Sequence, residues 1–400
     1  MAGPLQDLKV LELGQLIAGP FAGKTFAEFG ADLIKIEPPS QPGRPGGDPL
    51  RYWRQLHEGT SLWWHVQSRN KKSVTVNLRE PEGQDIVRRL ALEADIVIEN
   101  FRPGTLEKWG LGYEQLARDN PGLIMVRISG FGQTGPMRDQ AGFGSIGESM
   151  GGMRYVTGYP DRPPVRMNLS IGDAIASLHA VIGALMALHH RQRSGRGQVV
   201  DVALYEAVFN MMESVLPEYD LAGLVRERTG SNLTGIVPSN TYPSGDGTHI
   251  VIGANGDSIF RRLCQAMGRD DWLEDRSLQT NDGRATRAAE LDAGIAAWTS
   301  SLSADEALAR LGQAQVPSAR IYSIADIVSD PQYLARDMIR RVRLEDGTEL
   351  RVPGIVPKLS ATPGEVRGPG PRLGEHTGET LAAMGFSAEE IARMRAAGIV

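Results

Sequence analysis

The sequence predicts an α/β fold, and three observations lead to this prediction. Short runs rich in Val, Ile and Leu alternate with helix-like segments through the first third of the chain. Strands separated by helices in this way pair in a parallel sheet that is covered on both faces. The composition, 41% hydrophobic and 23% charged, excludes a collagen-like, disulfide-scaffold or largely disordered chain. The length of 400 residues exceeds one small core and indicates two or three structural units.

The strands and helices of the first half follow from hydrophobic spacing. Apolar and β-branched runs predict the strands, at residues 8–13, 31–37, 73–78, 94–99, 123–128 and 199–204. Apolar residues at helical spacing predict helices over 21–29, from Pro81 through Leu92, and over 173–191. A turn through Gly14 and Gly19 joins the first strand to the first helix.

The middle of the chain changes character. Residues 142–164 are rich in Gly and Pro, which predicts a loop or turn whose backbone can approach a ligand closely. Beyond them, the pattern predicts a strand at 249–253 and helices near 257–267, 283–300 and 304–312. Residues 354–372 are again rich in Pro and Gly and predict an extended connector. An amphipathic tail follows at 380–397.

These assignments divide the chain into two domains. We expect a large domain of residues 1–224, completed by residues 331–400. We expect a smaller α/β domain over residues 225–330. Neither domain shows an internal repeat or a low-complexity tract.

Charge and cysteine content limit the class of partner. Lys and Arg total 43 against 48 Asp and Glu, so no cationic excess is present to hold a nucleic-acid backbone. Cys264 is the single cysteine and has no disulfide partner in the chain, which fits a reducing compartment. The N-terminus lacks the pattern of a secretory signal, and the apolar residues 174–188 are too few to span a bilayer. We therefore expect a cytoplasmic protein with no nucleic-acid partner and no membrane partner.

Familiar cofactor and metal motifs are absent from the sequence. One feature fits a dinucleotide-binding site, because Glu37 ends the second strand, where a ribose-binding acid would lie. The glycines do not fit it, because Gly14, Gly19 and Gly23 lack the G-x-G-x-x-G spacing that brings the backbone against a pyrophosphate. The adjacent His189 and His190 point to different faces of one helix and do not readily share a metal ion. No H-E-x-x-H, Walker or G-x-S-x-G pattern occurs. The sequence therefore predicts chemistry without metal or cofactor.

Asp173 is the most informative single residue. It follows Gly172, comes just after the glycine-rich stretch, and precedes a strongly apolar helix. One interpretation is a helix N-cap, whose carboxylate accepts from the N–H groups of the next turn. The other is a nucleophile, because a helix N-terminus keeps a carboxylate ionised and oriented while glycines leave room for a substrate. The residue pattern leaves both interpretations open.

Several blocks of sequence resemble a known family. They are LKVLELGQLIAGPFAGKTFAEFGADLIKIE at 8–37, NKKSVTVNL at 70–78, ADIVIENFRPGTLEKWGLGYEQL at 94–116, ISGFGQTGP at 128–136, SIGDAIASL at 170–178, GRGQVVDVALYEAV at 195–208 and LGEHTGETL at 373–381. Together the blocks span nearly the whole chain in order. The sequence resembles a class III CoA-transferase, of the formyl-CoA transferase and carnitine CoA-transferase family.

The resemblance implies a reaction and a fold. In such enzymes one aspartate, matched here by Asp173, attacks a donor thioester and carries CoA as a covalent aspartyl thioester before passing it to a carboxylic acid. Neither ATP nor metal is needed, and coenzyme A enters as a substrate. The implied fold is a large Rossmann-like domain with a smaller α/β domain, in an interlocked homodimer.

The resemblance also implies contacts for CoA. The matching positions are Leu16, Ile17, Ala18, Val76, Asn77, Leu78, Arg79, Asn100, Phe101, Arg102 and Lys108. Lys71 and Lys72, with Arg102 and Lys108, are candidates to neutralise the CoA phosphates; as isolated observations they are also ordinary surface charges. A glycine-rich lid loop is matched by Gly230, Ser231, Asn232 and Gly235.

Departures from the family pattern bear on the substrate. Formyl-CoA:oxalate enzymes have Gln in place of Ile17 and a basic residue in place of Pro38, so a small oxalate pocket is not expected. Acyl-CoA racemases need a proton-transferring His where this chain has Phe143, and phenylalanine moves no proton. We expect CoA transfer from a donor such as succinyl-CoA. Arg166 either binds the second carboxylate of such a substrate or is an ordinary surface arginine. An acyl-CoA racemase or isomerase, and a non-catalytic CoA-binding homologue, are the alternatives.

Overall fold

The computed structural model describes residues 3–400, which form two compact units. The first unit holds the described chain up to Met153, together with Met167–Glu213 and Gln332–Val400. The second unit holds Arg154–Arg166 and Ser214–Pro331. The sequence predicted that residues 1–224 belong to the large domain as one continuous stretch. In the structure, residues 154–166 and 214–224 belong to the second unit.

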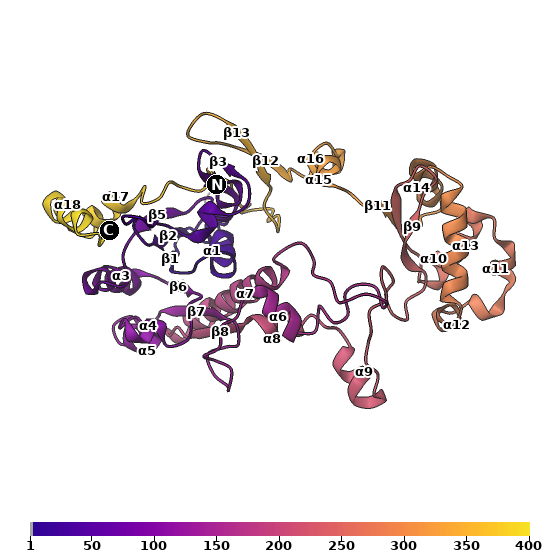
Figure 1. Cartoon of the computed structure of the whole chain (residues 1–400), viewed down its shortest axis with the longest axis horizontal. Helices are drawn as coiled ribbons and strands as arrows, with labels where there is room; N and C mark the ends of the chain where they lie inside the picture. The colour runs from indigo at the N-terminus through magenta and orange to yellow at the C-terminus, as the bar shows by residue number, and fades with distance from the viewer. Residues whose placement is uncertain (1–2) are drawn as a thin grey trace. The chain divides into compact units, whose positions relative to one another are not determined.

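A six-stranded parallel sheet forms the centre of the first unit (Figure 1). Its strands are β1 (Lys9–Glu12), β2 (Asp32–Glu37), β5 (Lys72–Thr75), β6 (Ile96–Glu99), β7 (Ile124–Ser129) and β8 (Val199–Ala203). They lie in the order β5-β2-β1-β6-β7-β8, and every neighbouring pair is parallel. The direction of strand addition reverses between β1 and β6, which is where open α/β sheets leave a crevice at the carboxyl ends of their strands.

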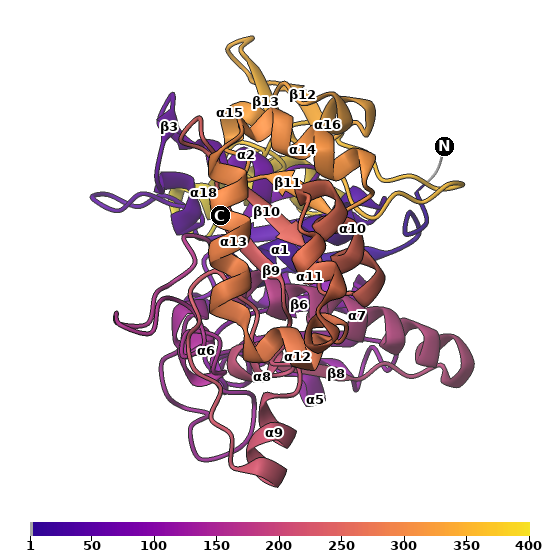
Figure 2. The same cartoon turned by 90° about the vertical axis from the view of Figure 1, so that its right-hand side faces the viewer.

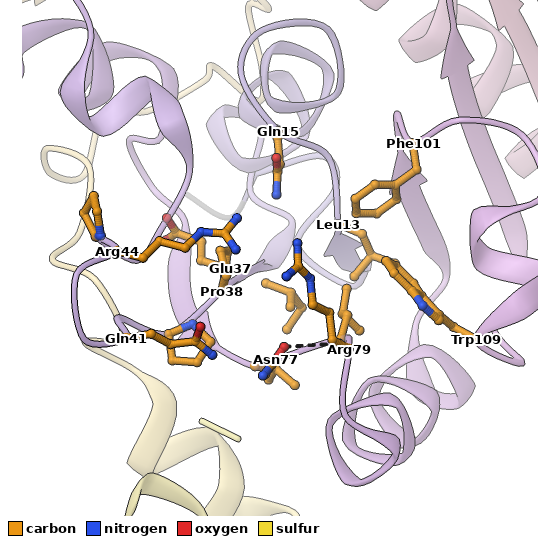
Figure 3. A pocket seen from close by; sticks show the side chains of 15 residues that line it. Leu13, Gln15, Glu37, Pro38, Gln41, Arg44, Asn77, Arg79, Phe101 and Trp109 are labelled. Atoms are coloured by element: carbon orange, nitrogen blue, oxygen red, sulfur yellow. Dashed lines mark hydrogen bonds between the residues drawn. The ribbon is translucent and has the colours of Figure 1, made fainter. Parts of the chain in front are cut away.

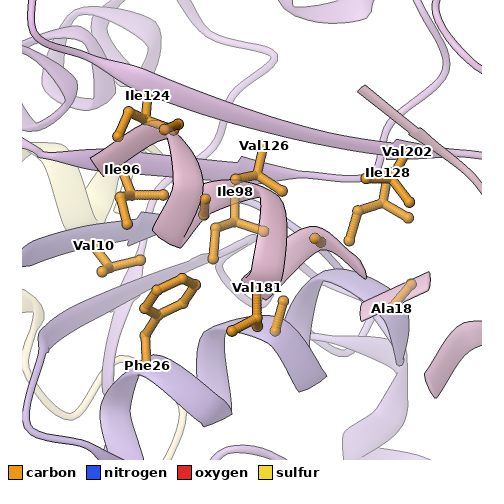
Figure 4. Packing of buried hydrophobic residues seen from close by; sticks show 14 of the residues in the cluster. Val10, Ala18, Phe26, Ile96, Ile98, Ile124, Val126, Ile128, Val181 and Val202 are labelled. Atoms are coloured by element: carbon orange, nitrogen blue, oxygen red, sulfur yellow. The ribbon is translucent and has the colours of Figure 1, made fainter. Parts of the chain in front are cut away.

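Helices cover both faces of this sheet because each strand is apolar on both sides. Along β1, Val10 packs into one hydrophobic cluster and the next residue, Leu11, into another. Helices α1 (Ala18–Glu28) and α7 (Ile171–Ser194) supply Phe26 and Val181 to the first cluster (Figure 4). Helices α3 (Pro81–Glu93), α4 (Thr105–Lys108), α5 (Tyr113–Leu116), α17 (Thr377–Ala383) and α18 (Ala388–Ala396) supply the second. The predicted parallel α/β architecture is confirmed.

The first unit has further elements outside the parallel sheet and its main helices, and some of them differ from the sequence-based prediction. They are η1 (Pro49–Tyr52), β3 (Leu56–His57), β4 (Thr60–Ser61), α2 (Leu62–Gln67), α6 (Gly144–Met150), α8 (Leu204–Phe209), β12 (Ile339–Arg343) and β13 (Glu349–Pro353). The prediction of a loop throughout 142–164 is wrong at α6, where Gly147 packs against Leu204 with no room for a side chain. The amphipathic tail expected over 380–397 is two helices, and Gly385, with φ +90°, lies between α17 and α18.

The second unit combines a three-stranded antiparallel sheet with helices. The strands β9 (Ser239–Pro243), β10 (His249–Gly253) and β11 (Ser318–Arg320) lie in the order β11-β10-β9. The helices are α9 (Val215–Ala222), α10 (Asp257–Met267), α11 (Asp270–Glu274), η2 (Arg276–Leu278), α12 (Asn281–Thr286), α13 (Ala288–Ser300), α14 (Ala304–Gln313) and α15 (Ile324–Ile327), with α16 (Pro331–Ala335) at the boundary of the two units. Helices α10 and α13 lie on one side of the sheet (Figures 1 and 2). The helix predicted over 283–300 is two helices, divided at Arg287.

Helix α7 is longer than the sequence suggested. It spans 24 residues, and by length and composition it is apolar enough to cross a membrane. One side of the helix packs in the core of the first unit through Ala176, Ala180 and Ala184. Its other side leaves Ile182 and Met186 exposed, at 50% and 67% of their surface.

Candidate active site

A pocket opens at the carboxyl ends of four neighbouring strands, and we name it the carboxyl-edge pocket (Figure 3). Its volume is about 280 Å³. The lining residues are Leu13, Gln15, Ile36, Glu37, Pro38, Pro39, Gln41, Arg44, Pro45, Val76, Asn77, Leu78, Arg79, Phe101 and Trp109. They follow β1, β2, β5 and β6, so the pocket includes the place where the strand order reverses.

The pocket combines cations with an aromatic wall. The side chains of Gln15, Arg44 and Arg79 point toward one another across it (Figure 3). Phe101 and Trp109 meet edge to face, with ring centroids 5.5 Å apart. Within residues 3–400, no carboxylate pairs with the guanidinium of Arg44 or Arg79. The two arginines are therefore available to a ligand that carries negative charge.

The acid in the same pocket has its partners within the chain. Glu37 accepts hydrogen bonds from Arg51 Nε and Nη2, both at 2.8 Å, and from Ser73 Oγ at 2.6 Å. The backbone N–H of Asp48 also donates to Glu37, at 2.8 Å. Because these donors use both carboxylate oxygens, Glu37 serves the structure of the loop and leaves the pocket positively charged.

The predicted CoA contacts are distributed around this edge of the sheet. Val76, Asn77, Leu78, Arg79 and Phe101 line the carboxyl-edge pocket together. Asn100 instead holds the loop after β1, because its side-chain amide both accepts from Gln15 N and donates to Gln15 O, at 2.8 Å in each case. Leu16, Ile17 and Ala18 form that loop and the start of α1. At the surface, Arg102 precedes α4 and Lys108 is its last residue.

Buried side chains hold the loop after β1 in one conformation. Leu16 has φ +64°, a left-handed conformation that costs a leucine about 1–2 kcal/mol. Asp48 compensates by accepting from Leu16 N with both oxygens, at 3.0 and 3.1 Å. Lys35 Nζ donates to Gly14 O at 2.7 Å, and Gln67 Nε2 donates to Ile17 O at 2.9 Å. The shape of the loop is thus fixed by contacts with other parts of the chain.

These contacts belong to a buried group of charges, the Glu12 cluster, which consists of Glu12, Lys35, Asp48 and Lys71. All four residues are at most 4% exposed. Glu12 accepts from Lys35 at 2.9 Å and from Lys71 at 2.7 Å, and Lys35 lies 2.9 Å from Asp48. Burial opposes the charge of Lys35, but Asp48 and Glu12 outweigh it and raise its pKa. Burial dominates at Lys71 and lowers its pKa to about 8, although Glu12 favours the charge.

Two of the cations suggested for the CoA phosphates have other partners. Lys71 lies in the Glu12 cluster and also donates to Pro20 O at 2.7 Å, so its prediction as a phosphate contact is wrong. Lys72 lies 2.8 Å from Asp32 at the surface. Sequence reasoning missed Gln15, Arg44 and Trp109. Gln15 lies three residues after the end of β1, which was a usable signal, whereas Arg44 lies in a turn whose position relative to β5 could not be read from spacing.

A second buried acid lies just behind Phe101. Glu99 ends β6, is 1% exposed, and accepts from Phe101 N and from Arg127 Nε, both at 2.7 Å. Arg127 also donates to Glu107 in α4, at 2.6 Å. Burial raises the pKa of Glu99 to about 7, against the opposing effect of Arg127. The carboxyl of Glu99 therefore supports the backbone next to the aromatic wall.

Asp173 lies inside the first turn of α7. Ser170 is the N-cap residue, so the interpretation of Asp173 as an N-cap is wrong. The helix macrodipole favours a negative charge at this position. The Asp173 carboxylate lies against the α-carbon of Gly144, where an added Cβ would be only 2.1 Å from Oδ2. Glycine at position 144 therefore makes room for this side chain.

The first turn of α7 contacts the start of α1. The buried hydroxyl of Ser177 lies 2.7 Å from the carbonyl oxygen of Ala18 and 2.6 Å from that of Asp173. On its other side, Glu148 of α6 is 1% exposed and accepts from Gly172 N at 3.4 Å. The structure thus brings Asp173 close to Ala18, two residues that the sequence separates by more than a hundred positions.

The residues predicted to form a lid belong to the second unit. Gly230 and Gly235 both have φ +72°. Ser231 Oγ donates to Asn240 at 2.6 Å, and the carbonyl of Gly235 accepts from Asn281 at 2.7 Å. Asn232 lies in the same loop. Within the described part of the chain, no group of three or more His, Cys, Asp or Glu side chains is placed to hold a metal ion.

Comparison with known proteins places these features in context. The model of CoA-transferase family III matches residues 5–377. Succinyl-CoA–D-citramalate CoA-transferase of Chloroflexus aurantiacus is 52% identical over 99% of this chain and 98% of its own. The succinyl-CoA–L-malate CoA-transferase alpha subunit of the same species is 41% identical over 99% of this chain and 92% of its own. A CAIB/BAIF family protein from Brucella suis has a crystal structure that superposes with a TM-score of 0.83 at 34% identity, covering 96% of this chain and all of that one.

Proposed function

The chain belongs to CoA-transferase family III and is an enzyme of the transferase class, and from this premise we propose that it moves CoA from a dicarboxylyl-CoA such as succinyl-CoA to a small carboxylic acid through Asp173. The observation that carries the proposal is the placement of Asp173. Its carboxylate lies in the first turn of α7 against Gly144, whose missing side chain leaves it room. The two relatives described above are named for succinyl-CoA as donor and hydroxy-dicarboxylates as acceptors.

The proposed chemistry conserves atoms and charge without a further reactant. The Asp173 carboxylate attacks the thioester carbonyl of the donor, the C–S bond breaks, and CoA thiolate leaves a mixed anhydride. The thiolate then attacks the aspartyl carbonyl, forming an aspartyl-CoA thioester and releasing the donor acid. The acceptor carboxylate attacks that thioester, the C–S bond breaks, and a second mixed anhydride and CoA thiolate are formed. The thiolate then attacks the acceptor carbonyl of the anhydride, which forms the product thioester and releases the Asp173 carboxylate. One thioester replaces another, so the protein needs mainly to orient its substrates.

We place the nucleotide portion of CoA in the carboxyl-edge pocket. Arg44 and Arg79 supply the charge that phosphates need, and Phe101 with Trp109 supplies an apolar wall for the adenine base. Arg44 lines the same pocket as Pro38 and supplies a positive charge there from a neighbouring turn. The loop of Leu16, Ile17 and Ala18 then leads from the pocket toward Asp173.

We further propose the assembly implied by the resemblance. The strand order of the first unit supports a Rossmann-like large domain, since counting its strands along the chain gives 3-2-1-4-5-6. The exposed side of α7, which includes Leu178, Ile182 and Met186, supports a homodimer in which this surface is covered. The loop of Gly230 and Gly235 is then a candidate lid, and the single Cys264 fits a cytoplasmic enzyme.

Intact-protein mass spectrometry tests the proposal most directly. The enzyme is mixed with succinyl-CoA and a panel of other acyl-CoAs, with the Asp173→Ala variant as control. We expect a CoA-sized adduct on the wild-type chain alone, and transfer to added carboxylic acids by the same preparation. An adduct on Asp173→Ala, or turnover that survives this substitution, contradicts the proposed route. Exchange of an α-proton in deuterated water without an acceptor identifies the alternative racemase.

A further inference from the structure

A second cavity, which we name the Trp63 cavity, opens beside the start of α7. Its volume is about 330 Å³, and its lining residues are Arg54, Gln55, Leu62, Trp63, Leu169 and Ser170. Ser170 is the N-cap of α7 and precedes Asp173 by three residues. At a rise of about 1.5 Å per residue, this places the cavity wall within one helical turn of the Asp173 backbone.

One wall of this cavity presents a guanidinium group on an aromatic surface. The Arg54 side chain lies over the Trp63 ring, with 4.7 Å from Cζ to the ring centroid. Trp53 extends the aromatic surface, its ring centroid 6.4 Å from that of Trp63. Within residues 3–400, no carboxylate pairs with Arg54, whereas the nearby Arg51 is fully paired with Glu37. Arg54 has no carboxylate partner and shares a cavity with Ser170, the N-cap of the helix that carries Asp173, so it is placed to bind a carboxylate of the substrate.

The backbone of Arg54 supports a functional role. Its φ is +59°, a left-handed conformation that is uncommon for a residue with a long side chain. Such strain persists where surrounding structure fixes it, and it is concentrated at ligand sites. Here η1 ends just before Trp53, and Gln55 O accepts from Leu62 N at 3.0 Å, so the turn that carries Arg54 is closed on both sides.

We infer that the Trp63 cavity holds the acyl group during transfer and that Arg54 binds its distal carboxylate, which makes Arg54 the residue that selects dicarboxylic substrates over monocarboxylic ones. The inference rests on the proposed function of Asp173. With the reacting carbonyl at Asp173, the methylene carbons lie along Trp63 and Leu169, and the far carboxylate meets the planar fork of Arg54. Arg166, which the sequence suggested for this purpose, belongs to the second unit.

A pair of donors that differ only at the far end tests the inference. Succinyl-CoA and butyryl-CoA have the same chain length, but butyryl-CoA has a methyl group in place of the distal carboxylate. In Arg54→Gln we expect kcat/KM for succinyl-CoA to fall about tenfold to a hundredfold, the size of a lost charge-assisted hydrogen bond. The rate with butyryl-CoA should change less than about threefold, because that donor never used the guanidinium.

Matched measurements separate binding at Arg54 from general damage. Arg54→Lys keeps the positive charge and should recover part of the preference for succinyl-CoA over butyryl-CoA. Arg54→Gln should bind free CoA with the affinity of the wild type. Inhibition by succinate should weaken in Arg54→Gln, and inhibition by butyrate should not. Arg341→Gln, on the exposed strand β12, is the control for removing a surface arginine.

The outcomes distinguish this inference from the proposed function. Equal losses with both donors, or an unchanged preference for succinyl-CoA in a folded Arg54→Gln enzyme, overturn the assignment of Arg54. Absence of a CoA adduct and of transfer in the wild type with every acyl-CoA overturns the role of Asp173 instead.

Discussion

Two sets of charged side chains in the first unit differ in where their partners are. In the Glu12 cluster, every charge lies within hydrogen-bonding distance of an opposite charge from another part of the chain. At the two cavities, Arg44, Arg54 and Arg79 have no carboxylate partner within the described residues 3–400. The buried charges fix the loop after β1, and the cavity arginines are left for ligands. The two sets should therefore respond differently to substitution.

The largest effect should come from breaking the Glu12 cluster. Lys71→Met removes one of the two lysines on Glu12 and leaves a buried carboxylate with less compensation. Breaking a buried ion pair costs about 3–5 kcal/mol, and the remaining Lys35 keeps the expected loss near about 3 kcal/mol. Urea unfolding of the two proteins at pH 7 measures the difference. If Lys71 contacts CoA instead, the free energy of unfolding will hardly change while the affinity for CoA drops.

Crowding the nucleophile should produce the next largest effect, this time on activity. Gly144→Ala adds a Cβ that must displace the Asp173 carboxylate, since the two would lie 2.1 Å apart. A displacement of about 1 Å in a reacting group costs about a hundredfold in rate. We expect adduct formation with succinyl-CoA to slow by at least about that factor.

The matched control for this prediction is Gly312→Ala. An added Cβ at Gly312, in α14, would meet no atom within 4 Å. That variant should keep full activity and gain a little stability, as Gly to Ala replacements in helices do. Wild-type rates in Gly144→Ala would show that Asp173 does not need its present position.

Arg79 and Lys72 provide a closer comparison of the two kinds of charge. Arg79→Gln should weaken CoA binding about tenfold at low salt, and the difference should shrink as ionic strength rises. Lys72→Gln should leave the affinity unchanged, because Lys72 pairs with Asp32. Calorimetric titration of CoA at two salt concentrations measures both variants. A Lys72 variant that binds as weakly as Arg79→Gln would move the phosphate site away from the carboxyl-edge pocket.

The sequence alone predicted the strands of the parallel sheet and most of the helices that cover it, but not the contacts between them. The parallel strands were accessible from hydrophobic spacing. Val76–Arg79 and Phe101 were predicted only through the family resemblance, and the structure places them together at one edge of the sheet. The burial of Lys71 could not be predicted, because the sequence around a lysine after a polar turn does not show whether its amine contacts solvent or Glu12. Residue patterns also left Asp173 between a cap and a nucleophile, and only the position of Ser170 removed the first interpretation.

Longer-range placement was equally beyond sequence patterns. Arg54 lies in an irregular turn. Its position in one cavity with Ser170 could not be predicted, because it depends on the packing of two segments more than a hundred residues apart. The hairpin of β12 and β13 was missed because the apolar Ile339, Val342 and Val352 are interspersed with exposed charges. Helix α6 was missed because its glycines suggested a loop, although Gly147 serves close packing against Leu204 of α8 and Gly144 makes room for Asp173.

The smallest effect concerns Glu99, a buried acid whose partner Arg127 belongs to the chain. It tests whether a charge that is paired within the chain contributes to stability. Its pKa of about 7 lies above the ordinary value of 4.5, because burial disfavours its charge more than Arg127 favours it. Between these two values the folded state binds one more proton than the unfolded state. The free energy of unfolding attributable to Glu99 is therefore greatest below pH 4.5 and falls as the pH rises through 7.

Removing the ionisable group should remove that slope. Glu99→Gln can accept from only one of its two donors, Phe101 N and Arg127, so its stability will be lower overall. Between pH 5 and 7, however, the wild type should lose about 1 kcal/mol per pH unit relative to the variant. Unfolding curves at half-unit intervals of pH measure this difference. Parallel curves would mean that Glu99 stays ionised throughout, and that Arg127 stabilises its charge enough to offset the effect of burial.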